Sequence, residues 1–181
     1  MNTQYLMKST SGIRGIIGVG INPVMITEYA AAFASMLNTK KRNGVLVVGR
    51  DSRPSGVAYA RAVIAGAMSV GADVVDIGIA PTPTVAMAVI GLKAMGGICL
   101  TASHNPGEWN ALKFFNSKGE FIDQKNFDSL ELAVSQKSYV YSDHMKFGVM
   151  REDYSWVEKH IDATLKAPAI NVATVRKRKF S

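Results

Sequence analysis

Cysteine is almost absent from the chain, because Cys99 is the single one among 181 residues. No disulfide can therefore form within the chain, and we expect a reducing compartment. Long hydrophobic runs are absent as well, since Arg61, Asp73 and Asp76 interrupt the longest apolar stretches and leave none that could span a bilayer. Segment 1–8 is polar and lacks the apolar region of a signal peptide. The sequence thus predicts a soluble, cytoplasmic protein without a membrane partner.

Charged residues are scarce, at 19% of the chain, whereas hydrophobic residues make up 48%. This composition excludes disorder over most of the length, and the chain is long enough for one domain with a substantial core. Four of the seven net positive charges lie near the C-terminus, at Arg176, Lys177, Arg178 and Lys179. This basic segment leaves a nucleic-acid contact open. A solvated segment at the end of a domain is the simpler interpretation, and we expect no nucleic-acid partner.

Strand, loop and helix patterns recur along the chain. Apolar stretches at 45–48, 72–79 and 96–100 predict buried strands, and Cys99 in the last of them is expected to be a core residue. Helical periodicity predicts helices at 23–42, 54–70, 82–93, 124–134 and 152–166, the last with Tyr154, Val157, Ile161 and Leu165 on one face. Residues 113–115 should form a hairpin with 121–122, and 135–149 should be irregular. This order predicts the α/β class, as a three-layer α/β/α sandwich with a mostly parallel mixed sheet.

A serine stands in the polar stretch that follows the third apolar run, TASHNP at 101–106. A serine hydroxyl is a poor nucleophile and a poor phosphate donor unless positive charge, hydrogen-bond donors and a base surround it. His104 and Asn105 can donate to phosphate oxygens, and Lys113 can act as an acid or base if its pKa is lowered. The pattern predicts that Ser103 is phosphorylatable, although these six residues alone would also suit an ordinary polar turn.

Two arginine-containing stretches belong to the same interpretation. Arg14 lies between glycines in a glycine-rich turn that leads into a strand, where it could clamp a phosphoryl group or be an ordinary surface arginine. Arg50, Asp51 and Arg53 follow a predicted strand, at the sheet edge where α/β proteins usually place their sites. We interpret these three as a charge cluster that supports a loop, and not as catalytic groups.

Four motifs resemble, in order, those of the α-D-phosphohexomutases, the superfamily that holds phosphoglucomutase, phosphomannomutase and phosphoglucosamine mutase. They are STSGIRG at 9–15, GRDSRPSG at 49–56, GIAPTPT at 78–84, and TASHNP at 101–106 with Asn110 and Lys113 behind it. Trp109 and Ala111 depart from residues common in the superfamily, Ala111 standing where glycine is frequent. The resemblance spans nearly the whole chain but only the first of the superfamily's four domains. It implies a phosphoserine domain at 1–166, followed at 167–181 by a linker or the start of a truncated second domain.

The resemblance also implies a reaction and its participants. Phosphate would move between the 1- and 6-positions of a hexose through a bisphosphorylated sugar intermediate, with Ser103 as nucleophile and phosphate donor. Lys113 would be an acid or base, Arg14 and His104 would contact the phosphoryl group, and Ser11 and Asn105 would help to bind phosphate. Mg²⁺ would take one oxygen from phospho-Ser103, and glucose 1,6-bisphosphate would be the activator. The partners would be the phosphosugar substrate and the remaining domains of the enzyme.

The sequence leaves several points open. No Asp-x-Asp-x-Asp run occurs, so we expect an incomplete magnesium site and no activity from the isolated chain. The threonine before Ala102 favours glucose or mannose phosphates, whereas the sequence EWNALK at 108–113 is similar to that of some phosphoglucosamine mutases. A non-catalytic domain that binds phosphosugars or regulates a partner is the alternative to an enzyme fragment.

Overall fold

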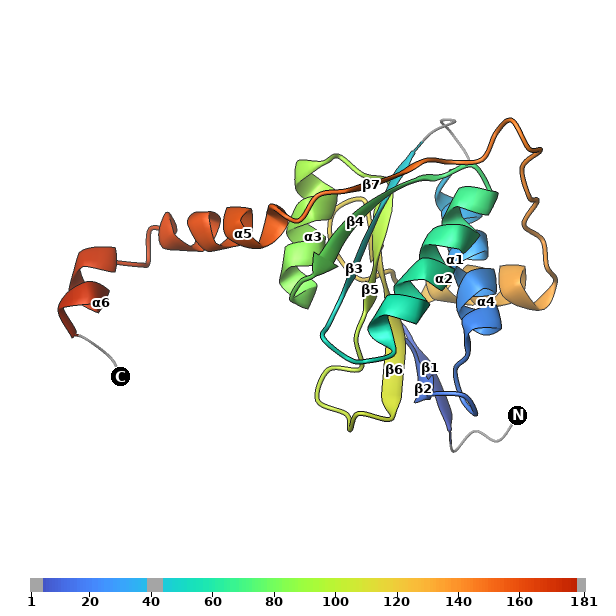
Figure 1. The fold of residues 1–181 in the computed structure, drawn as a ribbon, viewed down its shortest axis with the longest axis horizontal. Coiled ribbons are helices and arrows are strands. Elements are labelled where there is room, and N and C mark those ends of the chain that lie inside the picture. Colours follow the sequence, from blue (N-terminus) through green and yellow to red (C-terminus); the bar gives the residue numbers. More distant parts are fainter. Residues whose placement is uncertain (1–4, 39–43, 179–181) are drawn as a thin grey trace.

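A seven-stranded sheet runs through the body of the molecule (Figure 1). The structure is a computed structural model that describes residues 5–38 and 44–178. Across the sheet the order is β1-β2-β6-β5-β3-β4-β7. The strands are β1 (Leu6–Ser9), β2 (Gly12–Ile16), β3 (Val45–Arg50), β4 (Asp73–Ile79), β5 (Gly96–Leu100), β6 (Trp109–Asn116) and β7 (Met150–Glu152). β3 pairs in parallel with β4 and β5, and β4 with β7, whereas β1 with β2, β2 with β6 and β6 with β5 are antiparallel pairs. Only β1 and β6 therefore run against the rest, which confirms the mostly parallel mixed sheet.

Helices cover both faces of the sheet. One face packs against α1 (Pro23–Leu37), α2 (Gly56–Ser69) and α4 (Gln124–Ser135), with Phe33 and Phe114 in the core between them. The other face packs against α3 (Thr82–Gly91) and the beginning of α5 (Trp156–Leu165), around Val85 and Trp156. Two separate cores on opposite faces make the predicted three-layer α/β/α sandwich. Within the described part of the chain, no helix has the length and apolar character needed to cross a membrane.

Local sequence signals explain where two of the helices begin. The Asn22 side chain accepts a hydrogen bond from the Met25 backbone N–H at 3.0 Å, and proline at the first helical position suits α1. Asp123 caps α4 in the same way through Asn126. The expected continuation of the first helix to residue 42 cannot be compared, because 39–43 lie outside the described residues.

Strand β6 begins earlier than predicted. The sequence pattern placed its start at Lys113, but the strand already begins at Trp109. The apolar pattern missed this part of the strand because Asn110 is polar. Asn110 is nevertheless fully buried, and its side-chain amide has hydrogen-bond partners there. Its Nδ2 donates to Ser55 Oγ at 2.8 Å, and its Oδ1 accepts from the Ala111 backbone N–H at 2.8 Å. The edge strands β1 and β7 were also not predicted, since both are short and largely exposed and so carry no apolar pattern.

The predicted apolar face of the last helix is wrong in part. α5 begins only at Trp156, and Tyr154 precedes it. Trp156 packs tightly on Gly91, and His160 Nδ1 lies 2.7 Å from the hydroxyl of buried Thr84, so the first half of α5 is fixed on α3. Ile161 is 53% exposed, which shows that the second half leaves the core.

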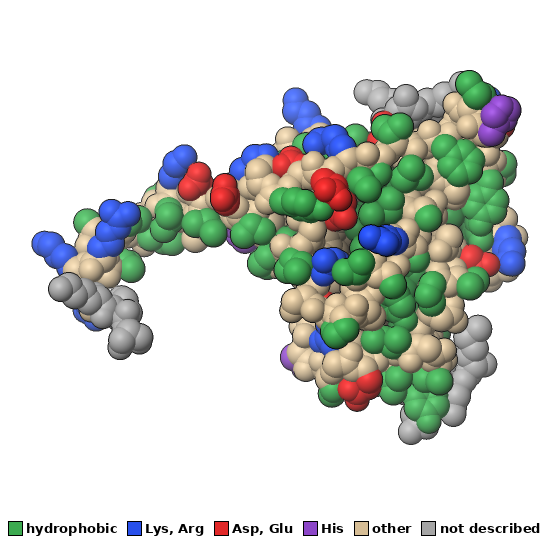
Figure 2. Space-filling view, viewed as in Figure 1, with side chains coloured by type: hydrophobic (Ala, Val, Ile, Leu, Met, Phe, Trp, Pro, Cys, Tyr) green, Lys and Arg blue, Asp and Glu red, His purple; other side chains and the backbone are tan. Residues whose placement is uncertain are grey.

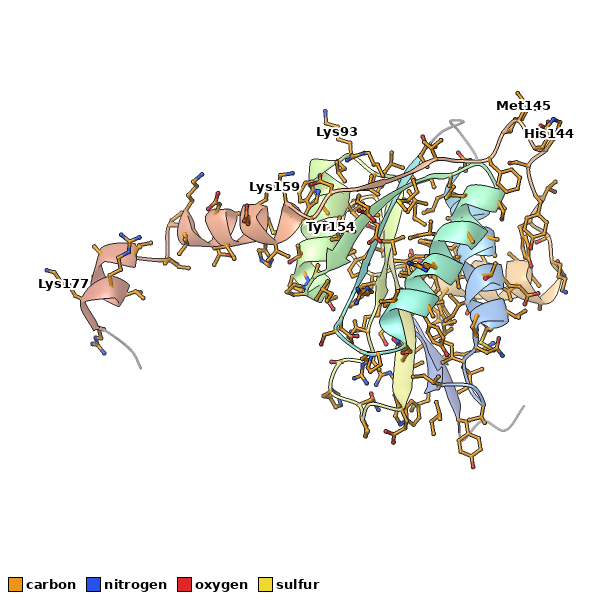
Figure 3. The ribbon with its side chains drawn as sticks, in the orientation of Figure 1. Lys93, His144, Met145, Tyr154, Lys159 and Lys177 are labelled. Atoms are coloured by element: carbon orange, nitrogen blue, oxygen red, sulfur yellow. The ribbon has the colours of Figure 1, made fainter. Side chains whose placement is uncertain are left out.

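An arm formed by α5 and α6 (Val172–Arg178) extends from the body (Figure 1). Lysine and arginine side chains are distributed along it (Figure 2), and Lys177 lies at its far end (Figure 3). α6 has no buried residue. Its arginines and Lys177 therefore form a solvated basic surface, while Lys179 of the predicted basic segment lies outside the described residues.

The connection between β1 and β2 requires Gly12. Its φ of 120° lies in a region that residues with a Cβ rarely adopt, and a Cβ built on it would overlap the carbonyl oxygen of Leu112 in β6. Gly18 also has a positive φ, of 89°, but a Cβ there would meet no atom within 4 Å. A substitution at Gly18 would therefore introduce backbone strain alone, whereas one at Gly12 would introduce both backbone strain and steric overlap.

We predict that Gly12→Ala lowers the free energy of unfolding by about 3 kcal/mol or more, because backbone strain of about 1–3 kcal/mol is joined by the clash with β6. Gly18→Ala, the matched control, should cost only the strain, about 1–2 kcal/mol. Urea unfolding followed by circular dichroism measures both values. Equal losses in the two variants would contradict a close approach of β2 to β6 at Gly12.

Candidate active site

Three loops meet at one edge of the sheet, where the parallel strands β3, β4 and β5 end. The Asp51 backbone N–H donates to the Leu100 oxygen at 2.9 Å, and the Ala80 N–H donates to the Arg50 oxygen at 2.9 Å. The loop at 101–108 joins β5 to β6 at this edge, near the beginning of α2 (Figure 1). The edge is the expected place for a site in an α/β protein.

Ser103 occupies a left-handed backbone conformation in that loop, with a φ of 57°. Its backbone N–H donates to Thr101 Oγ1 at 3.0 Å, and the Asn105 N–H donates to the Ala102 oxygen at 3.1 Å. Ser103 and His104 are both exposed. The loop backbone is thus held by a tight turn, while the serine and the imidazole remain accessible from solvent.

Arg53, in the loop after β3, crosses to the Ser103 loop. Its Nε donates to Asp51 Oδ2 at 3.0 Å, and its side chain is only 12% exposed. Its two terminal nitrogens donate to four backbone oxygens of the neighbouring loop and the start of β6, those of Ser103 (3.2 Å), Asn105 (2.7 Å), Pro106 (2.6 Å) and Trp109 (3.1 Å). The charge cluster of Arg50, Asp51 and Arg53 was predicted to support a loop. Through Arg53 it supports the Ser103 loop as well as the loop in which the cluster itself lies.

Arg14 approaches the same loop from β2. Its Nη1 donates to Asn105 Oδ1 at 2.7 Å. Arg14 pairs with Ala111 in the register of β2 and β6, so both side chains lie on one face of the sheet, together with that of Lys113 two residues further along β6. This face is opposite to the one that α1 covers, since Ile13 and Leu112 point into the core beneath α1. The small Ala111 side chain leaves space between the two cationic side chains.

A cavity of about 170 Å³ occupies that space. It is lined by Met7, Lys8, Ser9, Ser11, Gly12, Arg14, Ala111 and Lys113. The side chains of Arg14 and Lys113 lie on this face, and no carboxylate is among the described lining residues, a composition that favours an anion such as a phosphoryl group. Lys8 is paired with Glu131, so Arg14 and Lys113 are the cations best placed to receive it. Of two larger cavities, the one of about 410 Å³ is lined by Glu28 and Glu131, and the one of about 600 Å³ by Asp73.

The predicted site residues therefore fall into two adjoining groups. Arg14, Ser11 and Lys113 share the cavity, whereas Ser103 and His104 lie on the exposed loop and outside the cavity lining. The hydrogen bond from Arg14 to Asn105 joins the groups. The sequence pattern missed the contributions of β1 to the lining and the reach of Arg53, since β1 was not predicted and a contact across about 50 positions leaves no local signal.

The chain's own acidic residues do not fit a complete magnesium site. Among residues 5–38 and 44–178, no group of three or more His, Cys, Asp or Glu side chains comes together in a way that could hold a metal ion. These described residues therefore offer phospho-Ser103 no set of carboxylates that would complete six-coordinate oxygen ligation. We therefore derive no catalytic step through a metal from these residues.

Cys99 lies directly opposite Lys113 in the register of β5 and β6, but it is fully buried. Burial raises the pKa of its thiol to about 11, and the opposing effects of the Thr82 hydroxyl and the Lys113 charge are smaller. A thiol of this kind is not a nucleophile at neutral pH. The expectation that Cys99 is a core residue is confirmed.

The family described as phosphoglucomutase/phosphomannomutase, alpha/beta/alpha domain I, matches residues 6–140. A phosphoglucosamine mutase of Clostridium kluyveri is 32% identical over 90% of this chain and 38% of its own length. A phosphoglucomutase/phosphomannomutase of Thermococcus kodakarensis is 33% identical over 94% of this chain and 37% of its own. A crystal structure of a phosphoglucomutase/phosphomannomutase family protein from Burkholderia thailandensis superimposes with a TM-score of 0.76 at 25% identity, over 89% of this chain and 36% of that one. The chain thus spans less than two fifths of the length of these relatives.

We predict that iodoacetamide modifies Cys99 at least about 100-fold more slowly in the folded chain than in urea at pH 8, because a pKa of about 11 leaves that much less thiolate than the ordinary value of 9. The rate in the folded chain should rise with pH up to about 11, as the thiol loses its proton. Intact mass measures the modification without ambiguity, since the chain has one cysteine. Similar rates in the folded and unfolded chains would show that the thiol is accessible.

Proposed function

Because the chain belongs to the phosphoglucomutase/phosphomannomutase family, whose α/β/α domain I it matches over residues 6–140, we propose that it contributes the phosphoserine part of a phosphohexomutase active site. The observation that carries the proposal is the hydrogen bond from Arg14, which lines a cationic cavity, to Asn105 in the loop that carries the exposed Ser103. The function is the interconversion of hexose 1-phosphate and hexose 6-phosphate through a phosphoserine and a bisphosphorylated sugar.

The chemistry assigned to the chain is phosphoryl transfer from and back to Ser103. A sugar hydroxyl oxygen bonds to the phosphorus of phospho-Ser103 as the bond from phosphorus to the serine oxygen breaks. The hydroxyl proton passes to a base, for which the neutral amine of Lys113 is the candidate, and the released serine oxygen takes a proton to become a hydroxyl again. In the return step the Ser103 oxygen bonds to the phosphorus of the sugar's other phosphate as the bond from that phosphorus to the sugar oxygen breaks, and the sugar oxygen takes up the serine proton. Arg14 and His104 contact the transferring group, while Ser11 and Asn105 help to bind phosphate. Positioning and charge neutralisation carry reactions of this type.

The remaining participants lie outside the described residues. Under this proposal phospho-Ser103 would supply one oxygen ligand to Mg²⁺, further domains would supply the other ligands, and the metal would neutralise phosphate charge. Glucose 1,6-bisphosphate would phosphorylate Ser103 as the activator. Residues 1–166 form the phosphoserine domain, and 167–181 are a linker or the start of the next domain. The lengths of the relatives support the existence of further domains in such an enzyme, since the chain spans only 38% and 37% of them. The isolated chain should accordingly have no mutase activity.

The sugar is a glucose, mannose or glucosamine phosphate. Both a phosphoglucosamine mutase and a phosphoglucomutase/phosphomannomutase are about equally similar to the chain, at 32% and 33% identity. The second candidate function is a non-catalytic domain that binds or senses phosphosugars. What favours it is that the cavity by itself offers cations to a phosphate.

We predict that Ser103 becomes phosphorylated when the chain is mixed with domains II to IV of a full-length relative, Mg²⁺ and glucose 1,6-bisphosphate. Intact mass should rise by about 80 Da, the mass of one phosphoryl group, and peptide mapping should place it on Ser103. Ser103→Ala should abolish the increase, and Ser117→Ala, which removes an exposed serine in the turn after β6, should not. No increase, while the relative's own domain I is phosphorylated in the same mixture, would favour the non-catalytic domain.

We further predict that the isolated chain binds glucose 1,6-bisphosphate through its cationic cavity. Arg14→Ala and Lys113→Ala should each raise the dissociation constant about 10-fold, because each removes a charge-assisted contact to phosphate. Lys118→Ala, which removes an exposed lysine outside the cavity, is the control. Isothermal titration calorimetry measures all three. An equal loss in the control would mean that binding reflects net charge and not the cavity.

A further inference from the structure

The backbone oxygens of the Ser103 loop converge on a single side chain. Arg53 Nη2 donates to the backbone oxygens of Ser103 and Asn105, at 3.2 and 2.7 Å. Its Nη1 donates to those of Pro106 and Trp109, at 2.6 and 3.1 Å. With its Nε on Asp51, all five N–H donors of the guanidinium are used. The loop is therefore shaped around a group that comes from another loop.

Arg53 is itself held in place from the sheet. Asp51 accepts from Arg53 twice, through Oδ2 from Nε and through Oδ1 from the Arg53 backbone N–H at 3.1 Å. The Asp51 backbone N–H donates to the oxygen of Leu100, the last residue of β5. The guanidinium is thus fixed relative to the strand from which the Ser103 loop departs, and this loop has little freedom to move against the sheet.

Two properties of the loop depend on that fixed frame. The backbone of Ser103 has the left-handed helical conformation. This conformation costs free energy for a residue with a Cβ, so the surrounding contacts must maintain it. Asn105, whose oxygen is held by Arg53, presents its side-chain Oδ1 to Arg14 on β2. Release of the loop from Arg53 would therefore move both Ser103 and the bond that links it to the cavity.

We propose that Arg53 is a positioning residue that sets where the Ser103 phosphate stands relative to Arg14 and Lys113, without contacting the phosphate itself. The inference deepens the proposed function and rests on it. A lysine cannot replace Arg53, because an ammonium group offers three donors from one point and cannot reproduce the planar fork that spans four carbonyl oxygens.

The test uses the whole chain with phosphoserine installed genetically at position 103, so that no enzymatic phosphorylation is needed. Phosphorus NMR then follows the titration of the phosphate, whose second pKa is about 6 in an unstructured chain. In the unsubstituted chain this pKa should be lowered, because Arg14 and Lys113 favour the dianion. In Arg53→Lys it should return toward the value measured in urea, by about half a unit or more.

Hydrogen exchange on the same samples reports the loop directly. The amides of Asn105 and Trp109, which donate to Ala102 and Pro106 within the loop, should exchange at least about 10-fold faster in Arg53→Lys. The amides of β3 and β5 should be unchanged, which distinguishes a moved loop from general unfolding. Arg61→Lys, on the exposed surface of α2, is the matched control and should alter neither measurement.

Each outcome decides the inference. Unchanged titration and loop exchange in Arg53→Lys overturn the role of Arg53 and leave the proposed function standing. A phosphate that titrates in the unsubstituted chain as it does in urea overturns the proposed function and this inference with it. If Arg53→Lys does not fold, the same measurements are made on Asp51→Asn, which keeps the guanidinium and weakens its orienting ion pair. Unchanged values there overturn the inference as well.

Discussion

The antiparallel pairing of β6 with both β5 and β2 is the constraint on which the candidate site depends. It brings Leu100 opposite Leu112, and Arg14 opposite Ala111, so the loop after β5 and the arginine on β2 meet at one edge. Side chains alternate along a strand, and a shift of one residue in either register would turn Arg14 or Lys113 into the core beneath α1. The apolar residues Ile13, Leu112 and Phe114 prevent that shift, because each is fully buried on the α1 face. Core packing on one face thus fixes the cations on the other.

Polar groups at this edge are buried only where they have partners. Asn110 is fully buried, yet its amide binds Ser55 and the backbone of Ala111, and Arg53 is nearly buried with each of its donors used. An unpaired group in these positions would cost about 1–3 kcal/mol. The same contacts join the loops after β3 and β5 and the start of β6 into one unit. Ser103 and His104 remain exposed, and they are the groups that a reactant must reach under the proposed function.

The sequence predicted the elements whose signals are local. Continuous apolar runs gave β3, β4 and β5, and their common direction placed Ser103 at the same edge as Arg53. Prediction from the sequence failed where the burial of a residue depends on partners that are distant along the chain. A buried polar residue such as Asn110 has no local signature of a strand, so the predicted start of β6 lay several residues after the true one. The apolar residues of α5 are only partly used in packing, and periodicity cannot tell a covered face from an exposed one. The lining of the cavity could not be predicted in full, because part of it comes from β1, an exposed edge strand that lacks any apolar alternation.

Under the proposed function, the charge balance of the cavity indicates which share of the reaction this domain would perform. A transferring phosphoryl group carries negative charge on its equatorial oxygens, and catalysis consists largely of neutralising that charge in fixed geometry. The described residues offer Arg14 and Lys113 for this purpose and no carboxylate beside them, so they suit the phosphate and not a metal ion. Cations that bind the phosphate equally well before and during transfer would store it on Ser103 without accelerating its departure. Under the proposed function the difference between storage and transfer therefore comes from groups that approach the exposed face of the Ser103 loop, and those groups also choose the sugar.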